Sequence, residues 1–191
     1  MRKITAWILA FLFLTSLMPG ISLAQDGFAT QTIMVYIVGS DLEGDNGLAT
    51  ADIVEMLRSG MDTERVTVLV MTGGSEKWRA PMITVRNLSI FKVEGRNPTL
   101  LHQEPTKSMG EADTLSFFLN FAVEHFPADS YGLVLWNHGA GPMVGFGSDH
   151  LFGRDNLELL ELQQAMQNSP FSGENRLEWL CFDACLMASM E

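Results

Sequence analysis

A histidine and a cysteine each stand shortly after an apolar run of strand length. His138 follows the run 133–136, and Cys185 follows the run 177–182. A thiolate is a good nucleophile, and an imidazole exchanges protons near neutral pH. The carboxyl ends of neighbouring parallel strands meet at one edge of a sheet, so both side chains would lie over that edge if these two strands are neighbours. The two residues therefore predict a dyad for nucleophilic catalysis.

The backbone next to this pair could supply a site for a developing negative charge. Gly139 follows His138 and has no side chain, so it lets the backbone approach a substrate carbonyl closely. We expect the N–H groups of Gly139 and Cys185 to form an oxyanion hole. Taken alone, a histidine after a strand is more often an ordinary polar residue, and a cysteine is more often a buried one. The catalytic interpretation depends on the pairing.

The chain has a second cysteine, Cys181, which we expect in the core. Four residues of strand place it about 13 Å from Cys185, beyond the roughly 7 Å between bridged α-carbons. A disulfide between the two is therefore not expected. A zinc site is not expected either, because the other histidines have no ligand-like spacing.

The elements that would position these residues alternate between strand and helix. Their order predicts an α/β fold with a mainly parallel sheet, helices on both faces, and a small antiparallel excursion at one edge. Buried strands are expected at 32–38, 66–71, 131–136 and 177–182, helices at 48–59, 113–125 and 157–167, and edge strands at 82–88 and 89–93.

The first residues have the order of a secretory signal peptide. Two basic residues precede the apolar run 6–14, and small residues lead up to Ala24. We expect cleavage after Ala24, which leaves residues 25–191 as a secreted or periplasmic protein. An uncleaved anchor is the alternative, but the run is shorter than the roughly 20 residues that span a membrane. No stable membrane anchor is expected after cleavage.

The composition of the chain limits the kinds of molecule that the protein is expected to bind. The chain has 12 basic and 23 acidic residues, a formal net charge of −11, which argues against nucleic acid as a partner. Hydrophobic residues make up 47% of the chain, enough for a globular core. The two cysteines are too few for a disulfide-rich scaffold.

The end of the chain predicts that this sequence is the N-terminal part of a longer protein. The last strand leads into residues 183–191, which read as the start of a helix. A sheet whose last strand lacks its covering helix leaves an apolar face and an edge exposed. We therefore expect residues 25–191 to be an incomplete domain, cut short after the strand that precedes Cys185.

The motifs around the dyad resemble those of the clostripain family, the C11 cysteine peptidases of the caspase-like clan. They are Trp136-Asn137-His138-Gly139 and Phe182-Asp183-Ala184-Cys185-Leu186-Met187-Ala188, supported by the segments 35–42, 52–56 and 108–115. The spacing from His to Cys is close to the roughly 50 residues of the caspase signature. The resemblance implies a caspase-like α/β/α sandwich and cleavage of peptides after Arg or Lys. It implies Cys185 as nucleophile and His138 as general acid and base.

The same resemblance assigns Asp183 to the base of the primary specificity pocket. A carboxylate in a concave site pairs with an incoming guanidinium or ammonium group. The alternative is that Asp183 caps the helix expected to begin near Cys185. Both roles can hold together.

The resemblance also implies a zymogen that is cut between His138 and Cys185. The basic residues in that interval are Arg154 and Arg176. We favour Arg154 as the processing site, because Gly153 and polar neighbours indicate an exposed loop. Arg176 lies close to the last predicted strand.

No cofactor is expected to be required. Acidic residues alternate over 41–47 as in a calcium loop, and the resemblance allows calcium activation. The glycine comes one place late, and position twelve is Asp52 rather than Glu, which favours a solvated acidic loop. The rival to the peptidase interpretation is a catalytically inactive truncated homologue that acts as a secreted binding domain.

Overall fold

The computed structural model describes residues 30–187. The expected signal peptide, with its cleavage after Ala24, lies outside the described residues, as do residues 188–191 of the expected last helix. Within the described part, no helix is long and apolar enough to span a membrane.

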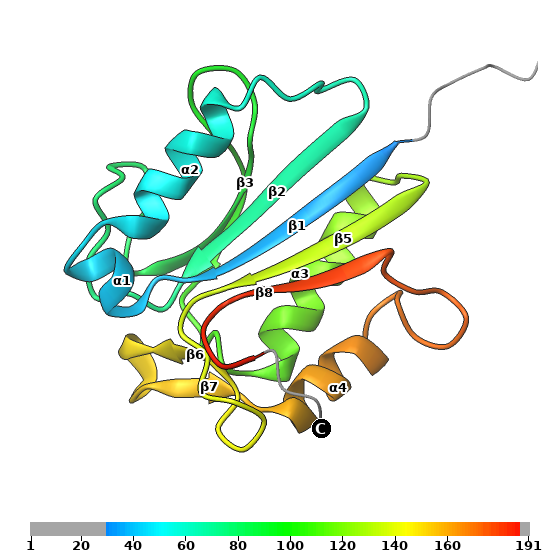
Figure 1. Ribbon diagram of the computed structural model, residues 1–191. Coiled ribbons are helices and arrows are strands. Elements are labelled where there is room, and N and C mark those ends of the chain that lie inside the picture. The colour runs from blue at the N-terminus through cyan, green and yellow to red at the C-terminus, as the bar shows by residue number, and fades with distance from the viewer. Residues whose placement is uncertain (1–29, 188–191) are drawn as a thin grey trace, which may run out of the picture.

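A six-stranded sheet forms the centre of the molecule (Figure 1). Its order is β4-β3-β2-β1-β5-β8, in which β1, β2, β5 and β8 run parallel and β3 and β4 are antiparallel. The α/β class and the mainly parallel sheet are confirmed. The strands are β1 (Gln31–Val38), β2 (Val66–Gly73), β3 (Asn87–Lys92), β4 (Thr99–Pro105), β5 (Ser130–Trp136) and β8 (Trp179–Asp183).

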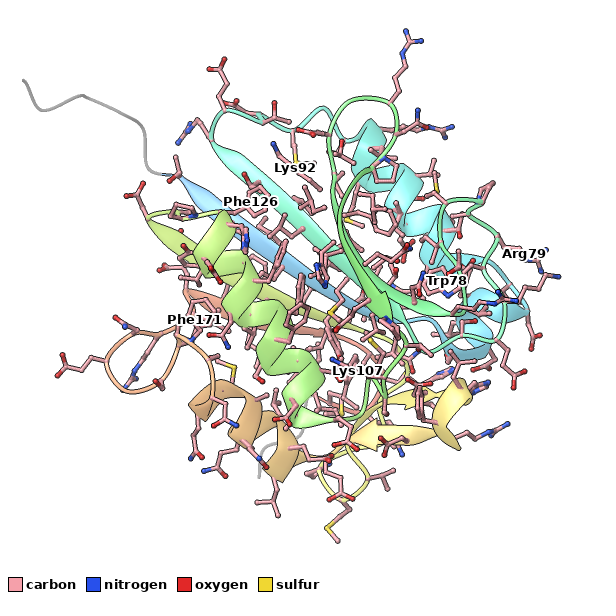
Figure 2. The ribbon with its side chains drawn as sticks, turned by 180° about the vertical axis from the view of Figure 1, so that it is seen from behind. Trp78, Arg79, Lys92, Lys107, Phe126 and Phe171 are labelled. Atoms are coloured by element: carbon pink, nitrogen blue, oxygen red, sulfur yellow. The ribbon has the colours of Figure 1, made fainter. Side chains whose placement is uncertain are left out.

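Helices cover both faces of this sheet, as expected. Helix α2 (Leu48–Arg58) packs on one face, where Ile53 meets Val35 and Val70. Helices α3 (Ala112–His125) and α4 (Leu159–Gln167) pack on the other face. Figure 2 shows α3 crossing that face, with Lys107 near one end and Phe126 at the other.

The antiparallel edge lies further along the chain than the alternation of residues predicted. Residues 82–86 form turns, and Gly95 and Pro98 lie in the connection between β3 and β4 rather than after the second strand. The polar segment after β1 begins with a short helix, α1 (Ser40–Gly44), where a loop was expected.

The glycine-rich segment after β5 contains structure that the sequence did not predict. Strands β6 (Phe146–Asp149) and β7 (Asp155–Leu157) pair antiparallel, with a 3-10 turn, η1 (His150–Phe152), between them. Asp149 holds this hairpin in place, because its carboxylate accepts hydrogen bonds from the N–H groups of Met109 and Leu151, each at 2.8 Å. Burial raises the pKa of Asp149, although these hydrogen bonds oppose the rise.

The prediction of Cys181 as a core residue is wrong. Cys181 is exposed, and its neighbour Leu180 is 42% exposed. Both lie on β8, which pairs with β5 on one side and forms the edge of the sheet. Among residues 30–187 no further strand pairs with β8, so its side chains are accessible whatever their polarity.

Candidate active site

The sheet brings the predicted dyad residues to one edge. Strands β5 and β8 are parallel neighbours, with Trp136 opposite Asp183 at their carboxyl ends. The N–H of Asn137 donates to the carbonyl of Asp183 at 3.3 Å, so the two chain segments leave the sheet side by side. His138 lies just beyond β5, and Cys185 lies in the turn just beyond β8.

Both side chains are accessible from solvent. Cys185 is exposed, and 45% of the His138 side chain is exposed. Within residues 30–187, no hydrogen bond joins the thiol of Cys185 to the imidazole of His138. Hydrogen bonds between catalytic groups are often long in a free enzyme and tighten when substrate binds.

Gly139 lies directly against the backbone of Cys185. A side chain at this position would overlap the carbonyl oxygen of Cys185 and contact Met187. The glycine was expected to let backbone approach a substrate carbonyl; in the structure it admits the backbone of Cys185. The N–H groups of Gly139 and Cys185 donate to no acceptor within the described residues, so both are free to bind an oxyanion.

His138 has a carboxylate partner that the sequence analysis did not assign. Its Nε2 lies 3.1 Å from Oδ1 of Asp41, on α1. Partial burial acts to raise the pKa of Asp41, but hydrogen bonds, including the one with His138, hold it below the usual value. A second histidine, His150 on η1, places its Nε2 3.5 Å from the same oxygen.

These groups line a polar cavity of about 680 Å³. The cavity is bounded by the β6–β7 hairpin, by α1 and by the segment after β2, which all meet near the carboxyl ends of the parallel strands (Figure 1). Charged and titratable residues dominate its wall: Asp41, Asp45, Glu76, Lys77, His138, His150 and Arg154.

Buried polar contacts fix the segment that carries Asp41. The side chain of Asn137 donates to Ser40 Oγ at 2.8 Å and to the carbonyl of Val38. Ser75 Oγ donates to the carbonyl of Ser40 at 2.6 Å. Ser40 has a φ of 44°, a conformation that non-glycine residues seldom adopt, so the surrounding contacts must hold it there.

Asp183 ends β8 with its side chain exposed. No hydrogen bond from residues 30–187 reaches its carboxylate, which is therefore available to a ligand. A second carboxylate, Asp52 on α2, accepts a 2.7 Å hydrogen bond from the indole N–H of Trp136. Burial raises the pKa of Asp52, and the nearby charge of Asp183 raises it further.

The two candidate processing residues are both exposed. Arg154 lies in the turn between η1 and β7 with a φ of 66°, and its N–H donates to the carbonyl of Asp149 at 2.7 Å. Arg176 lies in the segment before β8. The exposure expected for Arg154 is confirmed, but its turn is closed by a backbone hydrogen bond.

The acidic segment 41–47 does not form an open loop. Glu43 is buried on α1, and its carboxylate accepts hydrogen bonds from Thr50 N–H at 2.8 Å, Thr50 Oγ1 at 2.7 Å and Arg79 N–H at 2.6 Å. Asp41 is engaged with histidines. Calcium activation stays a prediction.

The sequence motifs assigned no site role to Asp41, His150 or Asp52. Asp41 could have been found, because it lies in the segment just after β1, the neighbour of β5 in the sheet, separated from the strand by Gly39 and Ser40. Asp52 lies on the face of α2 that meets Trp136, a pairing that helical periodicity alone does not give. Nothing in the sequence indicated His150, since the β6–β7 hairpin was not foreseen.

Comparison with solved structures identifies the fold. A secreted C11 cysteine protease from Bacteroides thetaiotaomicron in complex with an irreversible peptide inhibitor is 21% identical, with a TM-score of 0.66 over 84% of this chain and 44% of that one. A structure of the secreted C11 protease iotapain from the same organism is 17% identical, with a TM-score of 0.64 over 84% and 47%. An inactive zymogen C11 protease from Parabacteroides distasonis is 22% identical, with a TM-score of 0.58 over 83% and 43%.

This chain therefore spans less than half the length of those structures. At such identities the likeness is one of fold. No curated protein sequence matches the chain. A family model described as the clostripain family matches residues 35–191, which include the segments of both His138 and Cys185. By this match over most of its length, the chain belongs to the clostripain family, peptidase C11.

Proposed function

We propose that the protein carrying this chain is a cysteine endopeptidase that uses Cys185 and His138. The observation that carries the proposal is their placement beyond adjacent parallel strands, in a chain of the clostripain family. The thiol of Cys185 passes its proton to His138, and the sulfur attacks the scissile carbonyl. His138 then gives the proton to the leaving amine, and an acyl-enzyme forms. Water, deprotonated by His138, attacks the acyl carbon and releases the carboxylic acid and the thiol.

The oxyanion of the tetrahedral intermediate would bind to the N–H groups of Gly139 and Cys185. Two features support this role: both N–H groups are free of protein acceptors within the described residues, and Gly139 lies against Cys185. Removing one such donor typically costs roughly 100- to 1000-fold in kcat.

Selectivity for Arg or Lys would come from Asp183. Its carboxylate is exposed close to the nucleophile, and Asp52, whose pKa is raised by burial and by the charge of Asp183, adds a second carboxylate next to Trp136. Charge-assisted hydrogen bonds to carboxylates are strong enough to select a cationic side chain over a neutral one. The substrates would be proteins or peptides with Arg or Lys at the cleaved bond.

Export and self-processing are parts of the same proposal. The N-terminal sequence supports export, and two of the similar structures are described as secreted and one as an inactive zymogen. Arg154 would be the processing site, because it is exposed between His138 and Cys185. A peptidase binds the segment that it cuts in an extended conformation. The turn around Arg154 would therefore have to open first, because the N–H of Arg154 donates to the carbonyl of Asp149.

The test is a peptide library that varies only the residue before the cleaved bond, incubated with the complete natural protein that contains this chain. We expect hydrolysis after Arg and Lys that disappears in Cys185→Ala and His138→Ala. Asp183→Asn should lower kcat/KM for Arg peptides by roughly 10- to 100-fold, the range for a lost charge-assisted contact. Hydrolysis that survives Cys185→Ala, or that shows no preference for basic residues, would contradict the proposal.

A further inference from the structure

The Asp41 carboxylate faces the ring nitrogen of His138 that the proposed dyad does not need. Nε2 of His138 lies 3.1 Å from Asp41 Oδ1, which leaves Nδ1 for the thiol and the leaving group. A histidine has two distinct nitrogens, and the hydrogen bond made by one of them sets which one carries the proton. The sequence motifs assigned no role of this kind to Asp41.

The contact is fixed by the neighbours of both residues. Asn137 directly precedes His138, and Ser40 directly precedes Asp41. The Asn137 side chain donates to Ser40 Oγ at 2.8 Å, and both residues are at least 95% buried. An exposed ion pair alone stabilises a fold little, because its side chains remain mobile. Here buried hydrogen bonds join the two backbone segments, so the carboxylate and the imidazole are held in register.

The backbone conformation of Ser40 also indicates that the segment before Asp41 is held in place. Its φ of 44° lies in the left-handed region, which costs a serine free energy. Its N–H donates to the carbonyl of Gly74 at 3.1 Å, and its carbonyl accepts from Ser75 Oγ. These contacts keep the residue before Asp41 in an unfavourable conformation.

We propose that Asp41 is a positioning residue for His138: it accepts a hydrogen bond from Nε2–H and so directs Nδ1 toward Cys185 and the substrate. This inference rests on the proposed function. In the neutral ring the proton resides on Nε2, and Nδ1 accepts the proton of the thiol. In the imidazolium the Asp41 carboxylate stabilises the positive charge while Nδ1–H donates to the leaving amine.

Other charged groups surround the imidazole. Besides Asp41, the cavity wall holds Asp45, Glu76, Lys77, His150 and Arg154, and Cys185 lies in the turn after β8. The His150 ring is 3.5 Å from Asp41, a longer contact than that of His138. Asp113 on α3 offers a matched control, since it is exposed and lies outside this cavity, so Asp113→Asn removes the same charge without touching the site.

The first measurement is the rate and its pH profile in the complete natural protein. We expect Asp41→Ala to lower kcat by roughly 10- to 100-fold, within the range of general acid–base catalysis, with KM nearly unchanged. Asp41→Asn can still accept from Nε2–H but carries no charge, so it should retain more kcat. The acid limb of its profile should move to lower pH, because neutral His138 takes the proton of the thiol and the imidazolium loses a stabilising negative charge. Asp41→Glu should recover part of the loss, and Asp113→Asn should match the parent.

The second measurement does not depend on activity. In Cys185→Ala at alkaline pH, ¹⁵N shifts of the His138 ring should report the Nε2–H tautomer, and Asp41→Ala should abolish this preference. An Nδ1–H tautomer would overturn the inference, and so would an Nε2–H tautomer that stays the same in Asp41→Ala. An active Asp41→Ala enzyme with unchanged kcat and pH profile would overturn it as well. If Cys185-dependent hydrolysis is absent from the parent but the tautomer depends on Asp41, the proposed function fails and the Asp41–His138 pairing stands.

Discussion

At the scale of single residues, two carboxylates from different elements lie next to Trp136: Asp183 is its partner in the β5–β8 register, and Asp52 accepts its indole N–H. Asp183 is exposed at the end of β8, and Asp52 is half-buried on α2, where it accepts from the Trp136 indole. Burial and the charge of Asp183 both raise the pKa of Asp52. Folding therefore disfavours the ionised form of Asp52 relative to the unfolded chain, and groups perturbed in this way are common in functional sites.

The pKa of Asp52 gives a prediction with a definite sign. A carboxyl whose pKa is raised by folding contributes stability at low pH, and that contribution is lost as pH rises through the folded pKa. Asp52→Asn still accepts from Trp136 but never ionises. We expect its Tm at pH 7 to exceed that of the parent by about 1–3 °C, with no gain at pH 3. Thermal unfolding at both pH values measures this.

The matched control is Glu55→Gln, also on α2, because Glu55 is exposed and its charge also raises the pKa of Asp52. Glu55→Gln should raise the Tm at pH 7 by less than Asp52→Asn does. If Asp52→Asn were less stable than the parent at pH 7 but not at pH 3, the ionised carboxylate would be stabilising, and the raised pKa assigned to Asp52 would be wrong.

At the scale of elements, the parallel strands could be predicted from the sequence, and the irregular segments could not. A continuous apolar run of strand length, such as that of β1, is typical of a strand that is covered on both faces. Helices α2, α3 and α4 have apolar residues at helical spacing, which indicates helix. The β6–β7 hairpin lacks both signals. It is held by long-range contacts of a buried aspartate, Asp149, which leave no local pattern.

The residues of the candidate site also fall into two groups, those next to predicted strands and those on elements that the sequence did not predict. His138, Gly139 and Cys185 follow strands that the sequence predicted, and Asp183 ends one of them. The sequence could bring them to one edge only on the condition that these strands are neighbours, which the pairing of β5 with β8 shows. Asp41 and His150 meet His138 only through α1 and the hairpin, which the sequence did not predict as elements. Cys181 was placed in the core because strand residues are usually covered, and β8 lies at the edge of the sheet.

A prediction at this scale concerns the packing of the two turns that carry the dyad. Gly139→Ala places a methyl group onto the carbonyl oxygen of Cys185, and a clash with backbone is not relieved by rotating a side chain. We expect the Cys185 turn to shift and kcat to fall by at least tenfold, since small misplacements of reacting groups have large effects on rate. Peptide hydrolysis and thermal unfolding together measure the change.

Gly44→Ala on α1 is the control, because the nearest atom to its added methyl group is Ser75 Oγ at 3.3 Å. This variant should keep near-parental activity. A Gly139→Ala enzyme with parental kcat would show that the close approach of Gly139 to Cys185 is not required for catalysis.

At the scale of the whole molecule, the sheet joins chain segments on either side of the candidate processing site. Arg154 is followed by α4 and β8; β8 pairs with β5, and α4 packs in the core on the side of α3. Cleavage after Arg154 would cut the β6–β7 hairpin and leave these interactions in place. Burial of apolar surface then holds the two pieces in one body.

We therefore expect the processed protein to run as two fragments under denaturing conditions and as one species on size exclusion. Arg154→Ala should remain uncut, whereas Arg176→Ala, its matched control in the same interval, should mature at the parental rate. Intact mass spectrometry of the purified full-length protein measures the cleavage. An Arg154→Ala protein that is still cut between His138 and Cys185 would dismiss Arg154 as the site.

Cys185 is proposed as a nucleophile presented to basic substrates, and Cys181, the second cysteine of this chain, has no such role. The most direct measurement treats the complete protein with an irreversible electrophilic peptide ending in Arg and maps the label by mass spectrometry. We expect one label among the cysteines of this chain, on Cys185, which is lost in His138→Ala and weakened in Asp183→Asn. Equal labelling of Cys181 and Cys185 by the peptide, or none on Cys185 in the folded protein, would contradict the proposal.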